Sequence, residues 1–237
     1  ASDVYKRQVK ELVENSIDAG ATKIEIIMRN GGRTFVSVTD NGCGMSKRDL
    51  VLAVERHATS KLPTDNLDSI STLGFRGEAL PSIGAVSRLT IKTRSKDMDS
   101  GWSINVTGGD IEAVVPSSLK IVTQVEIRDL FYSTPARLKF LKTDRTETGR
   151  TIEVIRRIAM VNPNISFTLK DGTRTNVRFN GAQGNLPNIQ LSRIGEVLGR
   201  DFEENSLLIE AEREGFILTG YAGLPTLNKR TSSNQFL

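Results

Sequence analysis

The stretch Lys10-Glu11-Leu12-Val13-Glu14-Asn15-Ser16-Ile17-Asp18-Ala19-Gly20-Ala21 has the pattern of a helix with two faces. The side expected to pack on a core carries Leu12, Val13, Ser16 and Ile17. The other side is a line of polar groups three and four residues apart, which are Glu11, Glu14, Asn15 and Asp18. Like charges at this spacing repel one another, so this face is either a solvated surface or a site for a cation and a polarised water. Gly20 predicts the end of the helix.

The composition is that of an ordinary folded domain. The chain has 237 residues, 38% hydrophobic and 25% charged, with no apolar run near the ~20 residues of a membrane span and no secretory signal. A single cysteine, Cys43, excludes an internal disulfide, and with the lone His57 it argues against a Cys/His metal site. We therefore expect a cytoplasmic protein. A net charge of +4 permits binding to nucleic acid without requiring it.

Periodicity along the chain predicts a mixture of helices and strands. The expected helices are 10–21, 46–57, 74–86, 137–141, 150–161 and 191–198. The expected strands are 22–28, 34–39, 88–93, 102–107, 111–115, 123–129, 165–169, 175–179, 206–212 and 216–222. A long polar loop spans 58–73, and a Gly/Asn/Pro-rich linker spans 181–189. We predict a first domain over 1–185 and a second over 186–237.

Asp40-Asn41-Gly42-Cys43-Gly44 follows a predicted strand. Two glycines one residue apart let the backbone approach a flat ligand closely. A buried aspartate beside them could accept a hydrogen bond from an exocyclic amino group such as that of adenine. The alternative is a tight turn between strand and helix, in which Asp40 bonds to nearby backbone.

A second glycine-bounded turn, Gly74-Phe75-Arg76-Gly77-Glu78-Ala79-Leu80, begins a predicted helix. Free N–H groups and the helix dipole at such a start attract anions, and Arg76 adds a cation, although an ordinary helix start has the same pattern. Lys61, on the polar loop, could also reach a phosphate, but a lysine on a loop is usually a surface residue. The turn matches neither the phosphate-loop lysine motif nor the dinucleotide fingerprint.

Five blocks in this order, 10–21, 40–45, 56–61, 73–80 and 129–141, resemble the ATPase family of DNA gyrase, Hsp90 chaperones, histidine kinases and MutL mismatch repair proteins. The block Asp129-Leu130-Phe131-Tyr132-Ser133-Thr134-Pro135-Ala136-Arg137-Leu138-Lys139-Phe140-Leu141 is similar to that of the bacterial MutL branch. The resemblance implies an α/β sandwich, with a mixed, mostly antiparallel sheet covered by helices on one face. It places an ATP pocket between the helices and a lid, and then a truncated second α/β domain like domain 2 of ribosomal protein S5.

The resemblance also implies roles for individual residues. Glu11 matches the general base that draws a proton from the attacking water, Asn15 the Mg²⁺ ligand, and Asp40 the residue that reads adenine. The full set implied for the nucleotide is Asn15, Asp18, Asp40, Gly42, Gly44, Met45, Thr59, Ser60, Lys61, Leu73, Gly74, Phe75, Arg76, Gly77, Glu78, Ala79, Leu80 and Thr123. In the family a glycine precedes the threonine matched by Thr123. Here it is Val122, which predicts a strained turn.

The function implied by the resemblance is a DNA mismatch repair ATPase. ATP binding, Mg²⁺ and slow hydrolysis would drive dimerisation and DNA engagement, with a MutS-type mismatch recognition protein as partner, near the bacterial nucleoid and away from membranes. The densest basic residues, and therefore our candidates for DNA contact, are Arg137, Lys139, Lys142, Arg156 and Arg157. A solvated charged face is the alternative reading of these residues.

Other functions remain open on the sequence. The family's N-terminal arm and its sensor lysine have no match here, so this chain could bind nucleotide and DNA without hydrolysis. A histidine kinase is disfavoured because Glu11 matches a water-activating base and no histidine-bearing dimerisation helix is visible. The 131–141 block argues against a chaperone or a topoisomerase, by resemblance only.

Overall fold

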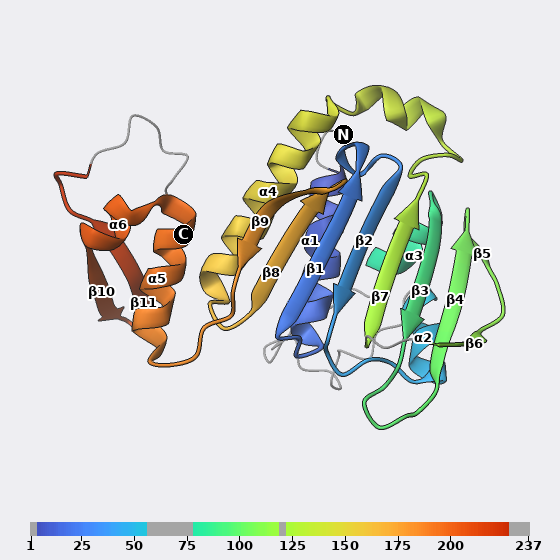
Figure 1. Ribbon diagram of the computed structural model, residues 1–237, viewed down its shortest axis with the longest axis horizontal. Coiled ribbons are helices and arrows are strands. Elements are labelled where there is room, and N and C mark those ends of the chain that lie inside the picture. The colour runs from blue at the N-terminus through green and yellow to red at the C-terminus, as the bar shows by residue number, and fades with distance from the viewer. Residues whose placement is uncertain (1–3, 56–77, 119–121, 228–237) are drawn as a thin grey trace. The chain divides into compact units, whose positions relative to one another are not determined.

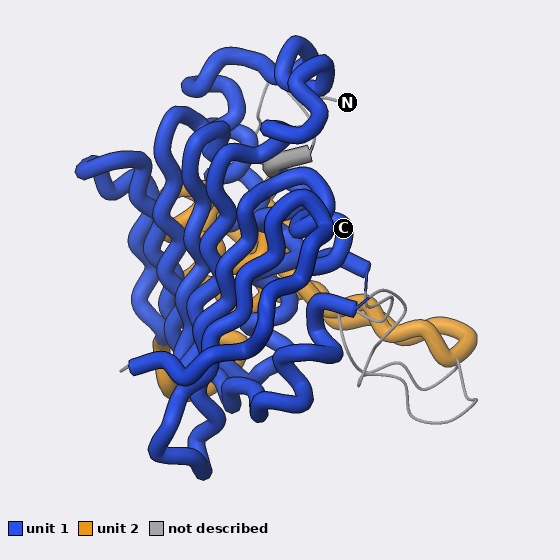
Figure 2. Tube along the Cα trace, turned by 90° about the vertical axis from the view of Figure 1, so that its right-hand side faces the viewer, with its two compact units in different colours: residues 1–155, 165–181 blue, residues 156–164, 182–237 orange. Residues whose placement is uncertain are grey.

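The computed structural model describes residues 4–55, 78–118 and 122–227. Contacts between residues divide the chain into two compact units. Unit 1 comprises residues 1–155 and 165–181, and unit 2 comprises 156–164 and 182–237 (Figure 2). The domain boundary expected at 185/186 stays a prediction, and the two units are described separately.

Unit 1 contains a nine-stranded sheet (Figure 1). Its strands are β1 (Lys23–Arg29), β2 (Phe35–Asp40), β3 (Arg88–Thr93), β4 (Gly101–Thr107), β5 (Asp110–Ile111), β6 (Val115–Ser117), β7 (Thr123–Arg128), β8 (Ser166–Asp171) and β9 (Arg174–Phe179). The order is β5-β4-β3-β7-β2-β1-β8-β9, with β6 paired to β4. Within this sheet β1 and β8 pair in parallel and the other pairs are antiparallel. The prediction of a mixed, mostly antiparallel sheet is therefore confirmed.

Helices cover one face of this sheet. Figure 1 shows α1 (Val4–Asp18), α2 (Lys47–Val54) and α3 (Ala79–Gly84) on the same side. Alternation in β1 turns Ile24, Ile26 and Met28 toward that layer, and all three are fully buried. In α2 the predicted start is confirmed, because the Ser46 hydroxyl accepts from the Asp49 N–H and the Asp49 carboxylate accepts from the Ser46 N–H.

The first helix begins earlier than its sequence pattern indicated. It runs from Val4, whereas the predicted helix began at residue 10, because Val9 extends the buried stripe of Leu12 and Val13 toward the N-terminus. It ends as predicted. Gly20 has φ +71° and its N–H bonds to the Ile17 carbonyl at 2.8 Å.

Two other expectations were wrong. The strand predicted over 111–115 is two short strands, β5 and β6, which pair with opposite ends of β4. The linker predicted over 181–189 overlaps α5 (Leu186–Leu198), whose early Pro187 is compatible with a first helical turn. The short helix predicted over 137–141 is present as the 3₁₀ helix η3 (Pro135–Phe140), which begins two residues earlier.

Unit 2 contains α5, α6 (Arg200–Glu204) and a hairpin of β10 (Ser206–Arg213) and β11 (Phe216–Gly223), together with the end of α4 (Asp144–Val161). Arg193 on α5 is 2% exposed and donates to the carbonyls of Ala159, Asn162 and Pro163. The expected second α/β domain is thus, in the described residues, a two-stranded hairpin with short helices. Residues 182–227 therefore do not form a sheet like that expected from domain 2 of ribosomal protein S5.

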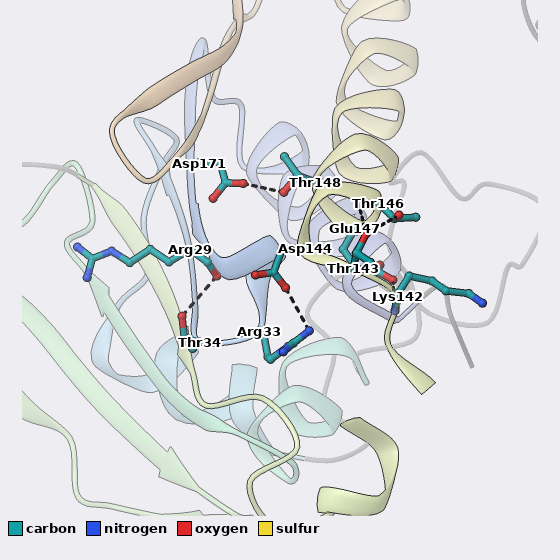
Figure 3. A network of polar contacts seen from close by, with 10 residues as sticks. All are labelled: Arg29, Arg33, Thr34, Lys142, Thr143, Asp144, Thr146, Glu147, Thr148 and Asp171. Carbon is teal, nitrogen blue, oxygen red and sulfur yellow. Dashed lines mark hydrogen bonds and ion pairs between the residues drawn. The ribbon is translucent and has the colours of Figure 1, made fainter. Parts of the chain in front are cut away.

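The turn between β1 and β2 supports the start of α4. Residues 30–32 form η1 (Asn30–Gly32), and all three have positive φ. Gly31 is buried, and a Cβ there would lie 2.7 Å from the Asp144 Cα. Asp144 is also 3.1 Å from the Arg33 guanidinium, and Thr148 donates to Asp171 at the end of β8 (Figure 3). The predicted turn is therefore also a packing surface for α4.

Gly31→Ala should destabilise unit 1 by more than Gly172→Ala. Both glycines have φ near +60°, so each alanine adds a backbone strain of about 1–2 kcal/mol. Only the Cβ at 31 meets backbone, because nothing lies within 4 Å of a Cβ at 172. Urea denaturation of both variants should show an extra loss of about 1–3 kcal/mol for Gly31→Ala. Equal losses would mean that the contact with α4 is easily relieved.

Candidate functional site

The polar face of α1 is half-buried along its length. Glu11, Glu14, Asn15 and Asp18 all have intermediate exposure. The Glu11 carboxylate lies 3.4 Å from Arg7, and the Glu14 carboxylate lies 3.1 Å from Lys10. These pairs, four residues apart on the helix, offset the repulsion expected among the carboxylates. Both cations are mostly exposed, so each pair adds little stability, and the Glu11 side chain is more exposed (36%) than that of Glu14 (15%).

Asp40 links this helix to the sheet. It is the last residue of β2 and is 5% exposed. Its carboxylate accepts a hydrogen bond from the Ser16 hydroxyl at 2.9 Å and another from the Gly42 N–H at 2.8 Å. Burial raises the pKa of Asp40, and the bonds from Gly42 and Ser16 oppose that rise. An aspartate held in this way still has acceptor capacity for one further donor.

The first glycine turn packs directly on the end of α1. The Cys43 N–H donates to the Ala19 carbonyl at 2.8 Å, and a Cβ at Gly42 would lie 2.7 Å from the same oxygen. Asn41 accepts from the N–H groups of Thr22 and Lys23. At Gly42 the closely approaching group is therefore α1, and the approach of this turn to a flat ligand stays a prediction.

The rest of this turn lies beside the adjoining strands. Gly44 has φ +72°, and a Cβ there would overlap the Arg94 carbonyl. The Thr93 hydroxyl is 3.0 Å from the Val122 carbonyl, the Thr123 hydroxyl and the Met45 N–H. Thr123 on β7 is also the register partner of Asp40 on β2. Thr123 therefore belongs to one cluster with Asp40 and Met45, although it lies about 80 residues further along the chain. The strain expected at Val122 stays a prediction.

The second glycine turn is described only at its end. Glu78 is exposed, and Ala79 and Leu80, which begin α3, are half-buried. Because α3 contacts α1, this end lies on the same side of the sheet as the acidic helix face. The remaining predicted nucleotide residues lie outside the described residues, and they are Thr59, Ser60, Lys61, Leu73, Gly74, Phe75, Arg76 and Gly77.

The candidate DNA-contact residues are all exposed. Arg137 and Lys139 lie on η3 and Lys142 on the loop that follows, in unit 1. The Arg137 guanidinium is 5.8 Å from the centre of the Phe131 ring. Arg156 and Arg157 lie on the exposed side of α4, in unit 2. Their exposure suits contact with a polyanion and equally suits a solvated face.

Sequence reasoning missed two polar residues of this cluster. Ser16 was assigned to the core face of α1, yet its hydroxyl donates to Asp40. Thr93 was only a strand residue, yet it is fully buried and joins Met45 to Thr123. A hydroxyl within an apolar stripe was the available signal for Ser16, since buried polar groups require partners.

Other features of the described residues are less specific. No helix among them is long and apolar enough to cross a membrane. They also hold no cluster of three His, Cys, Asp or Glu side chains that could bind a metal by itself. A hollow of about 610 Å³ is lined by Arg94, Asp99, Ser100, Gly101, Pro116, Ser117 and Ser118, none of which is a predicted site residue. The polar cluster around Asp40 is therefore a better candidate site.

Residues 4–132 match the family model described as histidine kinase-, DNA gyrase B-, and HSP90-like ATPase. The whole chain is 56% identical to DNA mismatch repair protein MutL of Rhodospirillum rubrum and 53% identical to that of Paramagnetospirillum magneticum. It spans 38% and 40% of their lengths.

Solved structures give the same result. The Aquifex aeolicus MutL ATPase domain complexed with ADP is 30% identical, with a TM-score of 0.68 over 87% of this chain and 71% of that one. A second structure of the ATPase domain from Aquifex aeolicus MutL, described as a bacterial mismatch repair endonuclease, is also 30% identical. Its TM-score is 0.66 over 94% of this chain and 72% of that one.

The family match covers the residues that build the Asp40 cluster, from α1 through Thr123. The relatives extend the match over the whole chain. The chain therefore belongs to the histidine kinase-, DNA gyrase B- and HSP90-like ATPase family and, within it, to the N-terminal ATPase region of the MutL mismatch repair proteins.

Proposed function

We propose that this chain binds Mg-ATP and hydrolyses it slowly to ADP and phosphate. The observation that supports this most is the pair of hydrogen bonds from Ser16 and Gly42 to the buried Asp40. They join the acidic face of α1 to a glycine turn that is suited to a flat base. The ADP complex of the Aquifex aeolicus relative supports nucleotide binding in the same fold.

Asp40 would receive the adenine amino group. Two of its acceptor positions are taken by Ser16 and Gly42, and a third would accept from the base. Thr123, the register partner of Asp40, would contribute its hydroxyl on the same side of the pocket. Met45 and the glycines at 42 and 44 would bring backbone close to the base.

Glu11 and Asn15 would act at the phosphate end. Ser16 is bonded to Asp40, and Glu11 lies five residues earlier, about 7.5 Å along the helix axis. A nucleotide held at Asp40 could therefore extend its phosphates along α1 toward Glu11. There the carboxylate would take a proton from the water that attacks the γ-phosphate.

The oxygen ligands on α1 suit a Mg²⁺ ion that is bound mainly by the phosphates of ATP. Mg²⁺ in nucleotide sites is bound by one or two protein oxygens, with phosphates and waters completing six positions. The half-buried Asn15 amide supplies such an oxygen, one helical turn from Glu11. When bound, Mg²⁺ would neutralise part of the phosphate charge and hold the phosphates in line for attack. Asp18 and the start of α3 at Glu78, Ala79 and Leu80 would border the same region.

The cellular function that we propose is DNA mismatch repair. The two relatives are named DNA mismatch repair proteins, and this chain spans about two fifths of the length of each. ATP binding would favour dimerisation and DNA engagement, with a MutS-type protein as partner, in the bacterial cytoplasm. The γ-phosphate would supply the contacts that distinguish the ATP-bound state from the ADP-bound state. The alternative is a module that binds nucleotide and DNA without turnover.

Glu11→Ala should abolish turnover and leave ATP binding nearly unchanged. Loss of a general base typically lowers the rate by about 10²–10⁴-fold. Phosphate release and binding of a fluorescent, non-hydrolysable ATP analogue would measure the two effects. Glu14→Ala is the matched control, because Glu14 lies on the same helix face and is also paired with a cation. Absence of hydrolysis in the unmodified chain, with the analogue bound, would favour the non-hydrolytic alternative.

Asp40→Asn should weaken nucleotide binding without destabilising the fold at pH 7. A lost hydrogen bond to a charged group corresponds to about 1.5–3 kcal/mol, or about 10–100-fold in affinity. Because burial raises the pKa of Asp40, its ionised form disfavours folding. The unmodified chain therefore loses stability as the pH rises from 3.8 through the raised pKa, and the asparagine variant avoids that loss.

Denaturation of both proteins between pH 3.5 and pH 7 would measure this difference, and calorimetry would measure nucleotide affinity. Asp110→Asn is the control, since Asp110 is an exposed aspartate on β5. A variant that is clearly less stable than the unmodified chain at pH 7 would contradict the assignment of burial as the dominant cause.

DNA affinity, where the chain has it, should fall steeply with salt and depend little on sequence. Contacts to phosphates release counterions, so the logarithm of affinity falls linearly with the logarithm of salt concentration. Substituting the exposed pair Arg156 and Arg157 by glutamine should reduce that slope by up to about 2. A titration at 50–200 mM salt would test this, and an unchanged slope would identify both as ordinary surface residues.

A further inference from the structure

Three arginines lie in a row at one end of four neighbouring strands in the unit 1 sheet. Arg29 at the end of β1 is the register partner of Phe35 at the start of β2. Phe35 is the partner of Arg128 at the end of β7, and Arg128 is the partner of Arg88 at the start of β3. Arg29, Arg128 and Arg88, named here the arginine row, therefore lie with Phe35 across four adjacent strands, at the upper ends of these strands in Figure 1.

The arginine row faces away from the helices. The strand neighbours Met28, Ile127 and Leu89 are buried under the helical layer, at no more than 1% exposure. Successive side chains on a strand point to opposite faces, so the arginines project from the other face. Arg29 is exposed, and the side chains of Arg88 and Arg128 are 55% and 53% exposed. All three can therefore reach a ligand in solution.

Aromatic rings hold these guanidinium groups in place. The Phe35 ring lies 5.4 Å from the Arg29 guanidinium and 4.7 Å from that of Arg128, and the Tyr132 ring lies 4.9 Å from Arg88. Two like charges thus share one ring. Stacking fixes the plane of a guanidinium but uses none of its N–H donors, which remain available for an anion.

Carboxylates neutralise the row only in part. Arg128 is 2.9 Å from Glu126, and Arg88 is 3.6 Å from Asp129. Each guanidinium has five N–H donors, so one carboxylate leaves donors on its other edge. The Arg29 side chain points away from the nearby Arg33–Asp144 ion pair (Figure 3). Three guanidiniums facing two carboxylates leave a local positive charge.

We propose that the arginine row binds the phosphate backbone of DNA. Strands are about 4.8 Å apart, so Arg29 to Arg88 spans about 14 Å, the axial length of about four phosphates on one strand of B-DNA. The row is a line of stacked cations and has no helix or strand that would enter a DNA groove. It would therefore contact phosphates rather than base edges. This inference rests on the DNA engagement in the proposed function and assigns it a surface that the basic sequence block at 137–142 and the α4 arginines do not include.

The arginine row is remote from the nucleotide cluster. Phe35 and Asp40 are the two ends of β2, about 17 Å apart along the strand. Their side chains also lie on opposite faces of the sheet, since Asp40 bonds to α1. Substitutions in the row should therefore change DNA affinity and leave ATP binding unchanged, which makes ATP binding an internal check on folding.

The main test is the double variant Arg29→Gln/Arg128→Gln of the full chain. Its affinity for a mixed-sequence 20-base-pair duplex, and for one strand of that duplex, would be titrated between 25 and 200 mM salt. We expect about 10–100-fold weaker duplex binding at 50 mM salt and a salt slope smaller by about 2. Arg29→Lys/Arg128→Lys keeps the charge and should retain affinity within about threefold.

The matched control is Arg178→Gln/Arg213→Gln, which removes the same charge at two exposed arginines on β9 and β10. It should bind DNA within about threefold of the unmodified chain. Equal loss in the control would show that only net charge matters and would overturn the proposal. An unchanged salt slope in the test variant would also overturn it.

A gain of affinity gives a test that misfolding cannot imitate. Glu126→Gln and Asp129→Asn each remove a carboxylate that competes with phosphate for an arginine of the row, so each should tighten duplex binding by about 2–5-fold. Weaker or unchanged DNA binding in both variants would contradict the proposal.

The unmodified chain provides the remaining outcomes. Binding of an acidic peptide without binding of DNA would also contradict the proposal. An unmodified chain that binds ATP but no DNA refutes both the row and the DNA engagement in the proposed function, and one that binds no ATP refutes the ATPase part. DNA binding that survives unchanged in Arg29→Gln/Arg128→Gln refutes the row alone.

Discussion

The hydrogen bonds that Ser16 and Gly42 donate to Asp40 connect the helix, the turn and the sheet of unit 1. A carboxylate that is 5% exposed would be costly without partners, because burial disfavours its charged form. Each partner belongs to a different element, so the carboxylate is satisfied only when α1, β2 and the following turn are correctly placed. One buried charge thereby sets the position of the polar face of α1.

Folding and the proposed nucleotide binding involve the same residues in this region. Gly42 has no room for a side chain, because a Cβ there would lie 2.7 Å from the Ala19 carbonyl oxygen, so the packing of the turn on α1 requires a glycine. The single hydroxyl hydrogen of Ser16 is shared, because the oxygen lies 3.1 Å from the Leu12 carbonyl within α1 and 2.9 Å from the Asp40 carboxylate. A substitution here therefore tests structure and ligand binding together, and only paired measurements of stability and affinity separate the two.

The sheet gives the two ends of β2 different surroundings. At its C-terminal end Asp40 points into the helical layer, where a low dielectric strengthens polar contacts. At its N-terminal end Phe35 lies on the open face, between two guanidinium groups. Period-two alternation places successive side chains on opposite faces, and a six-residue strand separates the ends by about 17 Å. A single strand thus borders the buried Asp40 cluster at one end and exposed guanidinium groups at the other.

Local patterns in the sequence were sufficient for the two-faced helix α1, the start of α2, the bounds of β3 and, through five ordered blocks, the ATPase family. These features depend on neighbours within a few residues, where periodicity and capping chemistry act. Errors came where a local pattern was weak, as at the start of α1, in the division of 111–115 into two strands, and in the linker that overlaps α5.

Only the tertiary structure showed that Ser16 bonds to Asp40, that Thr93 joins Met45 to Thr123, and that arginines 29, 88 and 128 form one row. The residues of each group are 24 to 99 positions apart. Strand order and register brought them together, and these follow from burying the whole core at once rather than from any local stretch of sequence.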